Sequence, residues 1–125
     1  EIRLSLVGSE MCIRDRAIIP PSVDGEKESS YHIYALRIKN FTEEQRDRMI
    51  DEIAKAEVAV NVHFIPMPML SFFKSLGYDI KNYPQAYENF KGEISLPIYP
   101  QLDEEQLNFI INVVKAAYIT VAGTE

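Results

Sequence analysis

Residues 31–57, YHIYALRIKNFTEEQRDRMIDEIAKAE, change from one hydrophobic period to another, and this change indicates the fold class. Residues 31–39 alternate between two faces, which is the pattern of a strand. From Thr42 the apolar residues recur at helical spacing, and Thr42 forms a capping box with Gln45 that marks a first helical turn. The stretch therefore predicts a strand followed by an amphipathic helix that ends near Glu57. The apolar face of the predicted strand carries His32, Tyr34, Leu36 and Ile38.

A second alternating segment, VAVNVHF at residues 58–64, follows the predicted helix. One face of this segment is uniformly apolar, whereas the other becomes polar at Asn61 and His63. Pro66 and Pro68 lack the N–H that a central strand donates, so we expect the strand to end before them. Strand ends often present side chains to a cleft, and the polar residues lie at this end.

Two short helices and a third strand are expected next. The first helix covers residues 70–76 and ends at Gly77, and the second covers residues 83–90 with Pro84 in its first turn. Residues 93–96 then predict a short strand, which the following proline closes.

The last helix is the most strongly marked element. Asp103 forms a capping box with Gln106, and Leu102 faces Leu107 as a hydrophobic staple. The order of elements is β-α-β-α-α-β-α, which predicts the α+β class: a small, mostly antiparallel sheet with helices packed on one face. The buried stripe of the last helix is predicted to contain Leu107, Ile110, Ile111, Val114 and Tyr118.

The N-terminal segment has a different character. Residues 10–15, EMCIRD, match one reading frame of the transposon-end adapter used to prepare DNA sequencing libraries, so we expect residues 1–16 to be adapter-derived and without a fold. Residues 17–30 predict a polar linker because they contain Pro and Gly and show no period. The folded domain is expected over residues 31–120, with residues 121–125 as a tail.

Composition limits the function classes. The net charge of -6 argues against binding to a phosphate backbone, which requires clustered Lys and Arg. The longest apolar runs are far shorter than the roughly 20 residues that span a bilayer. Cys12 is the one cysteine and lies in the adapter segment, so disulfides and thiolate metal sites are not expected. These features predict a soluble, cytoplasmic domain that binds neither nucleic acid nor membrane.

The candidate site residues are few. His32 and His63 are the two side chains that titrate near neutral pH without a large shift, and no metal-ligand spacing accompanies them. His63 and Asn61 share the polar strand end and are the first candidates for ligand binding. His32 fits a structural histidine in the core or at a sheet edge as well as a functional one. No phosphate loop or nucleophile elbow is present, so the residues themselves indicate no catalytic machinery.

Three ordered motifs carry a resemblance to a known family: VNVHF followed by Pro66, then Tyr83-Pro84-x-Ala86, then ISLPIYP at residues 94–100 before an acid-capped helix. Together they resemble the C-terminal small domain of the DegT/DnrJ/EryC1/StrS family of pyridoxal-phosphate-dependent nucleotide-sugar aminotransferases. The resemblance extends over residues 30–118. It implies a fold type I homodimer that moves an amino group, usually from glutamate, onto a keto-sugar carried on a nucleotide.

The resemblance also indicates what this chain lacks. Members hold pyridoxal 5'-phosphate as a Schiff base on a lysine of the large domain, where an acid partners the pyridine nitrogen. No lysine of this chain has that context, so no catalytic or cofactor-binding residue is nominated, and the fragment is expected to be inactive. By similarity, His63, Asn61 and His32 are expected at the substrate side of the cleft. Pro68 stands where many members have a second histidine.

Two other classes of function remain open from the residues. The capped helices and small size would also suit a free-standing α+β module that binds a ligand or regulates a partner. A purely structural or interaction protein is the third possibility.

Overall fold

The computed structural model describes residues 16–18, 23–30 and 32–123. In these ranges a three-stranded antiparallel sheet has the order β1-β4-β5, formed by β1 (Ala17–Ile18), β4 (Tyr34–Ile38) and β5 (Glu93–Leu96). A separate hairpin joins β2 (Val23–Asp24) to β3 (Lys27–Glu28). The α+β class and the antiparallel sheet predicted from the sequence are confirmed.

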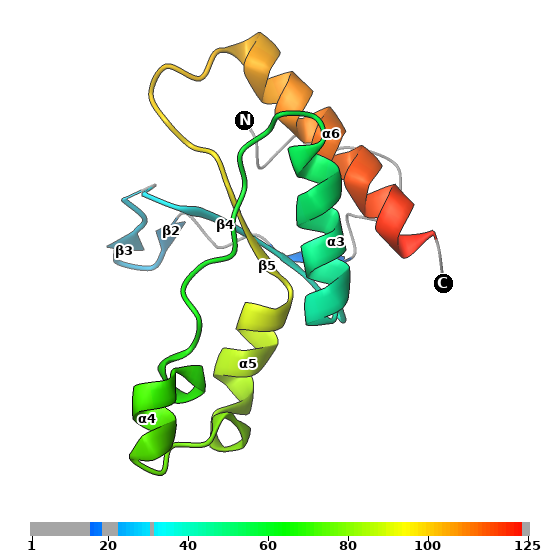
Figure 1. Cartoon of the computed structure of the whole chain (residues 1–125). Coiled ribbons are helices and arrows are strands. Elements are labelled where there is room, and N and C mark those ends of the chain that lie inside the picture. The colour runs from blue at the N-terminus through cyan, green and yellow to red at the C-terminus, as the bar shows by residue number, and fades with distance from the viewer. Residues whose placement is uncertain (1–15, 19–22, 31, 124–125) are drawn as a thin grey trace.

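Two long helices cover one face of this sheet. They are α3 (Glu43–Ala54) and α6 (Glu104–Ala122), which pack against each other (Figure 1). Both predicted capping boxes are present, with Thr42 and Asp103 accepting from the backbone N–H of Gln45 and Gln106. The predicted starts of both helices are therefore confirmed.

The core lies between the sheet and these two helices. The face of the sheet turned toward the helices carries Leu36 and Ile38 of β4 and Ile94 and Leu96 of β5. The rings of Phe41 and Tyr118 stack with their centroids 5.9 Å apart. Burial of these apolar side chains is the main stabilising contribution to the fold. The helices contribute Met49, Ile53, Ile110, Ile111, Val114, Ala117, Tyr118 and Val121 to the core.

Four short helical elements connect α3 to β5 on the way back to the sheet. Gly77 ends the first α-helix of this connection with a φ of 91°, a value that glycine adopts without strain. Figure 1 shows α4 and α5 at the end of the molecule away from α6. The two short helices predicted over residues 70–76 and 83–90 and the strand predicted over residues 93–96 are confirmed to within one or two residues. The connecting elements are η1 (Met67–Met69), α4 (Ser71–Ser75), η2 (Ile80–Asn82) and α5 (Pro84–Lys91).

The strand predicted over residues 58–64 is wrong. Within the described residues, this segment meets the sheet through one isolated bridge between Asn61 and Ser95. Phe64, assigned to the apolar face, is 85% exposed. Alternating hydrophobicity marks residues that fit a half-buried strand, but a strand also requires a partner that continues alongside it. Here β5 extends over only four residues, Glu93–Leu96, and offers little length for pairing.

The first predicted strand is shorter than expected, since it begins at Tyr34 and leaves His32 outside. The register explains this limit, because Tyr34 pairs with Leu96 and the next partner on β5 would be Pro97, which cannot donate. The first helix also ends earlier, at Ala54, and Glu57 adopts a positive φ of 59°.

Both ends of the predicted domain need correction. Ala17–Ile18, assigned to the linker, pairs with β4, and Ala17 packs against the core. Two residues are too few for a period to be seen in the sequence. Helix α6 continues to Ala122 and buries Val121, which the sequence had placed in the tail. Arg16, the last residue of the predicted adapter segment, accepts a hydrogen bond of 2.7 Å from the N–H of Lys39 at its carbonyl. Residues 1–15 lie outside the described residues, so for them the adapter segment stays a prediction.

Among the described residues, no helix combines the length and the apolar character needed to cross a bilayer.

Candidate substrate-binding site

The face of the sheet that α3 and α6 leave uncovered carries the candidate site. Arg37 of β4 lies opposite Glu93 of β5, and Ala35 lies opposite Ser95. Residues alternate between the two faces of a strand, so these four share the face opposite the core. Their side chains are more polar than those beneath the helices.

A cavity of about 270 Å³ lies over this face. The sheet forms its floor with Arg37 and Glu93, and the segment after Asn61 forms one wall with His63 and Phe64. Helix α5 forms another wall. The residues of α5 that line the cavity are Ala86, Asn89 and Phe90.

Glu93 is the most deeply placed polar group of this cavity, with 5% of its surface exposed. Its Oε2 accepts a hydrogen bond of 2.9 Å from the backbone N–H of His63, and its Oε1 accepts one of 2.9 Å from the Ser95 hydroxyl. Each carboxylate oxygen therefore has a partner, which compensates the cost of burying the group.

Arg37 and Asn89 join the floor of the cavity to its helical wall. The Nη1 of Arg37 donates to the Oδ1 of Asn89. This contact links β4 to α5 through two residues that are 52 positions apart in the sequence. The cavity thus presents guanidinium, amide, carboxylate and imidazole groups, a set that can bind a ligand rich in hydroxyl or anionic groups.

Arg46 anchors helix α5 to helix α3. This residue of α3 is 3% exposed, and its Nη1 donates a hydrogen bond of 2.9 Å to the backbone carbonyl of Phe90. Its guanidinium carbon lies 4.8 Å from the centre of the Phe90 ring, a cation–π distance. Arg46 therefore connects α3 to the end of α5 that lines the cavity.

A second contact between α3 and α5 should make the stability of the chain depend on pH at the alkaline end. The hydrogen bond between the Tyr87 hydroxyl and the Glu43 carboxylate, strengthened by the negative charge of Glu43, raises the pKa of Tyr87 above its ordinary value. A raised folded-state pKa means that this contribution to stability is complete below the unfolded-state pKa and is lost as pH rises through the folded-state pKa. We expect the ultraviolet titration of tyrosinate to lose a component that lies above the ordinary tyrosine pKa when Tyr87 is replaced by Phe.

The matched variant for that titration is Glu43→Gln, which removes the charge but keeps the length of the side chain. It should return the pKa of Tyr87 toward the ordinary value. If Tyr87→Phe instead removed an early step of the titration, the Glu43 contact would not exist in solution.

The structure separates the three residues predicted from the sequence. His63 lines the cavity, and its ring lies 5.1 Å from that of Phe64 in an edge-to-face arrangement. Asn61 is exposed and makes the bridge to Ser95 two residues away. His32 is exposed, precedes β4 and does not line this cavity. The structural reading of His32 as a core residue is therefore wrong.

Sequence reasoning missed Arg37, Glu93 and Asn89. A signal existed for the first two, because Arg37 alternates with the apolar residues of its strand and Glu93 alternates with Ile94. Both positions lie on the face of their strand opposite the buried apolar one. Nothing in the local sequence marks Asn89, since its place depends on how α5 packs.

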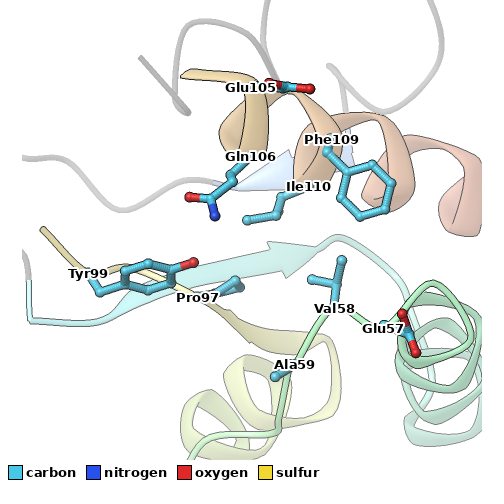
Figure 2. A pocket seen from close by; sticks show the side chains of 9 residues that line it. All are labelled: Glu57, Val58, Ala59, Pro97, Tyr99, Glu105, Gln106, Phe109 and Ile110. Carbon is cyan, nitrogen blue, oxygen red and sulfur yellow. The ribbon is translucent and has the colours of Figure 1, made fainter. Parts of the chain in front are cut away.

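A larger cavity of about 490 Å³ lies beside the first turns of α6. Figure 2 shows Phe109 and Ile110 of α6 on one side of it and Pro97 and Tyr99 on the other. Among the described residues of its lining, the charged ones are Glu57 and Glu105, and none is His, Lys or Arg. Because the smaller cavity brings together more kinds of polar group, we take the smaller one as the candidate site.

The chain has a small α+β fold with a polar cavity over its sheet. Comparison with known proteins identifies its class. Residues 11–115 match the DegT/DnrJ/EryC1/StrS aminotransferase family. The chain belongs to this family, which confirms the resemblance found in the sequence. The match begins within the predicted adapter segment, whose boundary at residue 16 stays a prediction.

Solved structures and curated relatives agree with this assignment. A protein of Streptococcus pneumoniae named as a sugar aminotransferase is 35% identical with a TM-score of 0.88, over 98% of this chain and 29% of that chain. A transaminase of Campylobacter jejuni for UDP-4-amino-4,6-dideoxy-N-acetyl-beta-L-altrosamine is 29% identical over 67% of this chain and 22% of its own length. A spore coat polysaccharide biosynthesis protein of Bacillus subtilis is 27% identical over 78% of this chain and 26% of its own length. The chain thus spans less than a third of these relatives.

Proposed function

We propose that this chain is the C-terminal small domain of an aminotransferase that uses pyridoxal 5'-phosphate to move an amino group, from glutamate, onto a nucleotide-linked keto-sugar. The observation that carries the proposal is the likeness to the Streptococcus pneumoniae protein, which has been solved in a PLP form and a PMP form. The proposal includes a homodimeric, cytoplasmic enzyme, in keeping with the sequence-based expectations.

The described residues do not form a cofactor site by themselves. Among those that line the candidate cavity there is no lysine that could hold pyridoxal phosphate as a Schiff base. When bound, that cofactor supplies an electron sink for the amino transfer. We assign the cofactor and its lysine to the remaining part of the full-length protein.

This chain contributes substrate binding in the proposed enzyme. His63 and Arg37 line a cavity whose groups match the hydroxyl and phosphate groups of a nucleotide sugar. Asn61 lies two residues from His63 and fixes the segment that carries it. We keep His32 as a weaker candidate, because it is exposed and separate from the cavity.

An apolar surface supports a larger protein over the free-standing module. Between Phe64 and Tyr83 the connection through α4 exposes large apolar side chains, with Phe64 at 85%, Phe72 at 65% and Met67 at 62%. Contiguous exposed apolar surface marks an interface with another body of protein. A free-standing soluble domain would leave this surface in water.

The function is tested with the gene and two purified proteins. We expect the DNA upstream of the Ala17 codon to continue as an open frame that encodes a lysine in the family's cofactor-binding context. The enzyme made from that frame should aminate a nucleotide-linked keto-sugar with glutamate as donor, and the 125-residue chain alone should not. Turnover by the 125-residue chain, or a start codon directly before Ala17, would contradict the proposal.

In the same enzyme, His63→Ala should raise the KM for the sugar about tenfold and leave kcat nearly unchanged, because the lost contact serves binding. His32→Ala is the matched control and should change KM by less. Equal effects of the two substitutions would remove His63 from the site.

A further inference from the structure

The segment that carries His63 departs from the sheet at a defined point. Asn61 and Ser95 form a bridge in which the N–H of each residue donates to the carbonyl of the other, at 3.4 and 2.7 Å. In an antiparallel pair the next such exchange lies two residues further along each strand in opposite directions. That position pairs His63 with Glu93.

At this position a side chain replaces the backbone acceptor. The N–H of His63 donates to the side-chain Oε2 of Glu93, at 2.9 Å, and not to a backbone carbonyl of β5. The backbone carbonyl of Gly92 accepts from Ile38 on the opposite edge of the strand. Backbone groups along a strand point alternately to its two neighbours, so the N–H and the carbonyl of Glu93 point toward the His63 segment. A continued strand would have formed hydrogen bonds with both of them.

The inserted side chain has a geometric consequence. Paired strands lie about 4.8 Å apart, too close for a side chain between their backbones. An acceptor at the end of the Glu93 side chain holds the backbone of His63 further from β5 than a backbone acceptor would. Both residues line the cavity. The Ser95 hydroxyl, 2.9 Å from Oε1, fixes the direction of the carboxylate.

We propose that Glu93 is a positioning residue whose carboxylate takes the place of a backbone carbonyl of β5 as the acceptor for the His63 N–H. The carboxylate thereby keeps the His63 segment from pairing with β5 as a further strand. This holds the cavity open with His63 at its edge. This role rests on the hydrogen-bond geometry and does not depend on the identity of the substrate. It also explains why a segment with strand periodicity is not a strand.

The test compares Glu93→Ala with Glu93→Gln in the 125-residue chain by nuclear magnetic resonance. Alanine has no acceptor, so the His63 amide should either exchange with solvent about tenfold faster, the effect of one lost hydrogen bond, or join a continued ladder. A continued ladder would bring the α protons of Val62 and Ile94 into contact. Glutamine keeps a carbonyl acceptor for the His63 N–H and should resemble the wild type in both measurements.

Internal references separate positioning from general stability. The amides of Leu36 and Ile94, in the buried strands, should keep their exchange rates in both variants. Ser95→Ala is the matched control, since it removes a partner of the carboxylate and leaves the acceptor for His63. An unchanged His63 amide in Glu93→Ala, a glutamine variant that behaves like alanine, or equal acceleration of Leu36 and Ile94 would each overturn the proposal.

Discussion

Replacing Gly92 with alanine is expected to destabilise the chain by about 2 to 3 kcal/mol, because the added methyl group would meet backbone. An ideal Cβ at Gly92 would lie 2.5 Å from the carbonyl oxygen of Ile38. The N–H of Ile38 also donates to the carbonyl of Gly92 at 2.9 Å, so the two backbones are held together there. Neither atom can rotate away as a side chain would.

The opposing effect is smaller. Alanine restricts the unfolded chain more than glycine does and so stabilises a protein by about 0.4 to 1 kcal/mol where the native backbone accepts it. The steric cost therefore exceeds the gain. The measurement is the free energy of unfolding in urea for the wild type and the variant.

Gly77→Ala is the matched control for this prediction. Gly77 has a φ of 91° and no atom within 4 Å of an added Cβ, so the cost there comes from backbone conformation alone. That cost is about 1 to 2 kcal/mol. If Gly92→Ala destabilises the chain less than Gly77→Ala, the contact between Gly92 and the backbone of Ile38 is not as tight as the structure shows.

Replacing Arg46 with alanine is expected to cost about 3 kcal/mol, since the buried carbonyl of Phe90 would lose a charged donor and keep only the N–H of Gly92. The substitution also removes the guanidinium packed over the Phe90 ring. Asp47, which accepts from Nε at 2.8 Å, has a side chain that is 61% exposed and would remain hydrated. The loss therefore comes from the contacts with α5 and not from an orphaned charge.

Two variants make this prediction specific. Arg46→Lys keeps the charge but cannot reach the Phe90 carbonyl and Asp47 together, so an intermediate loss is expected. Lys55→Ala removes the exposed ion pair with Glu52 and should cost less than about 0.5 kcal/mol. Urea unfolding of the three variants gives the order, and an Arg46→Ala loss no larger than that of Lys55→Ala would contradict the anchoring role.

The elements that local sequence specifies were predicted well. The starts of α3 and α6 follow from Thr42 with Gln45 and from Asp103 with Gln106, pairs only three positions apart. The bounds of β5 also agree, because Pro97 ends it. These features depend on contacts between near neighbours in the chain, and a sequence shows such neighbours directly.

The geometry around the candidate site could be foreseen only in small part. His63 was singled out because it follows alternating residues and precedes a proline, and it lines the cavity. Its role in binding stays a prediction. Arg37 and Glu93 become neighbours through the register of β4 with β5, which neither strand specifies alone. Asn89 enters through the packing of α5, which Arg46 anchors from another helix.

The sequence by itself determined the α+β class, the capped helices and the family. Periodicity, capping pairs and ordered motifs all depend on residues that are close together or in fixed order along the chain. Tertiary structure decided whether the alternating residues 58–64 became a strand, where Glu93 directed its carboxylate, and that Ala17–Ile18 completed the sheet. The physical reason is the same in each case. A strand exists only with a partner across space, and the partner that β5 offers to His63 is a side chain.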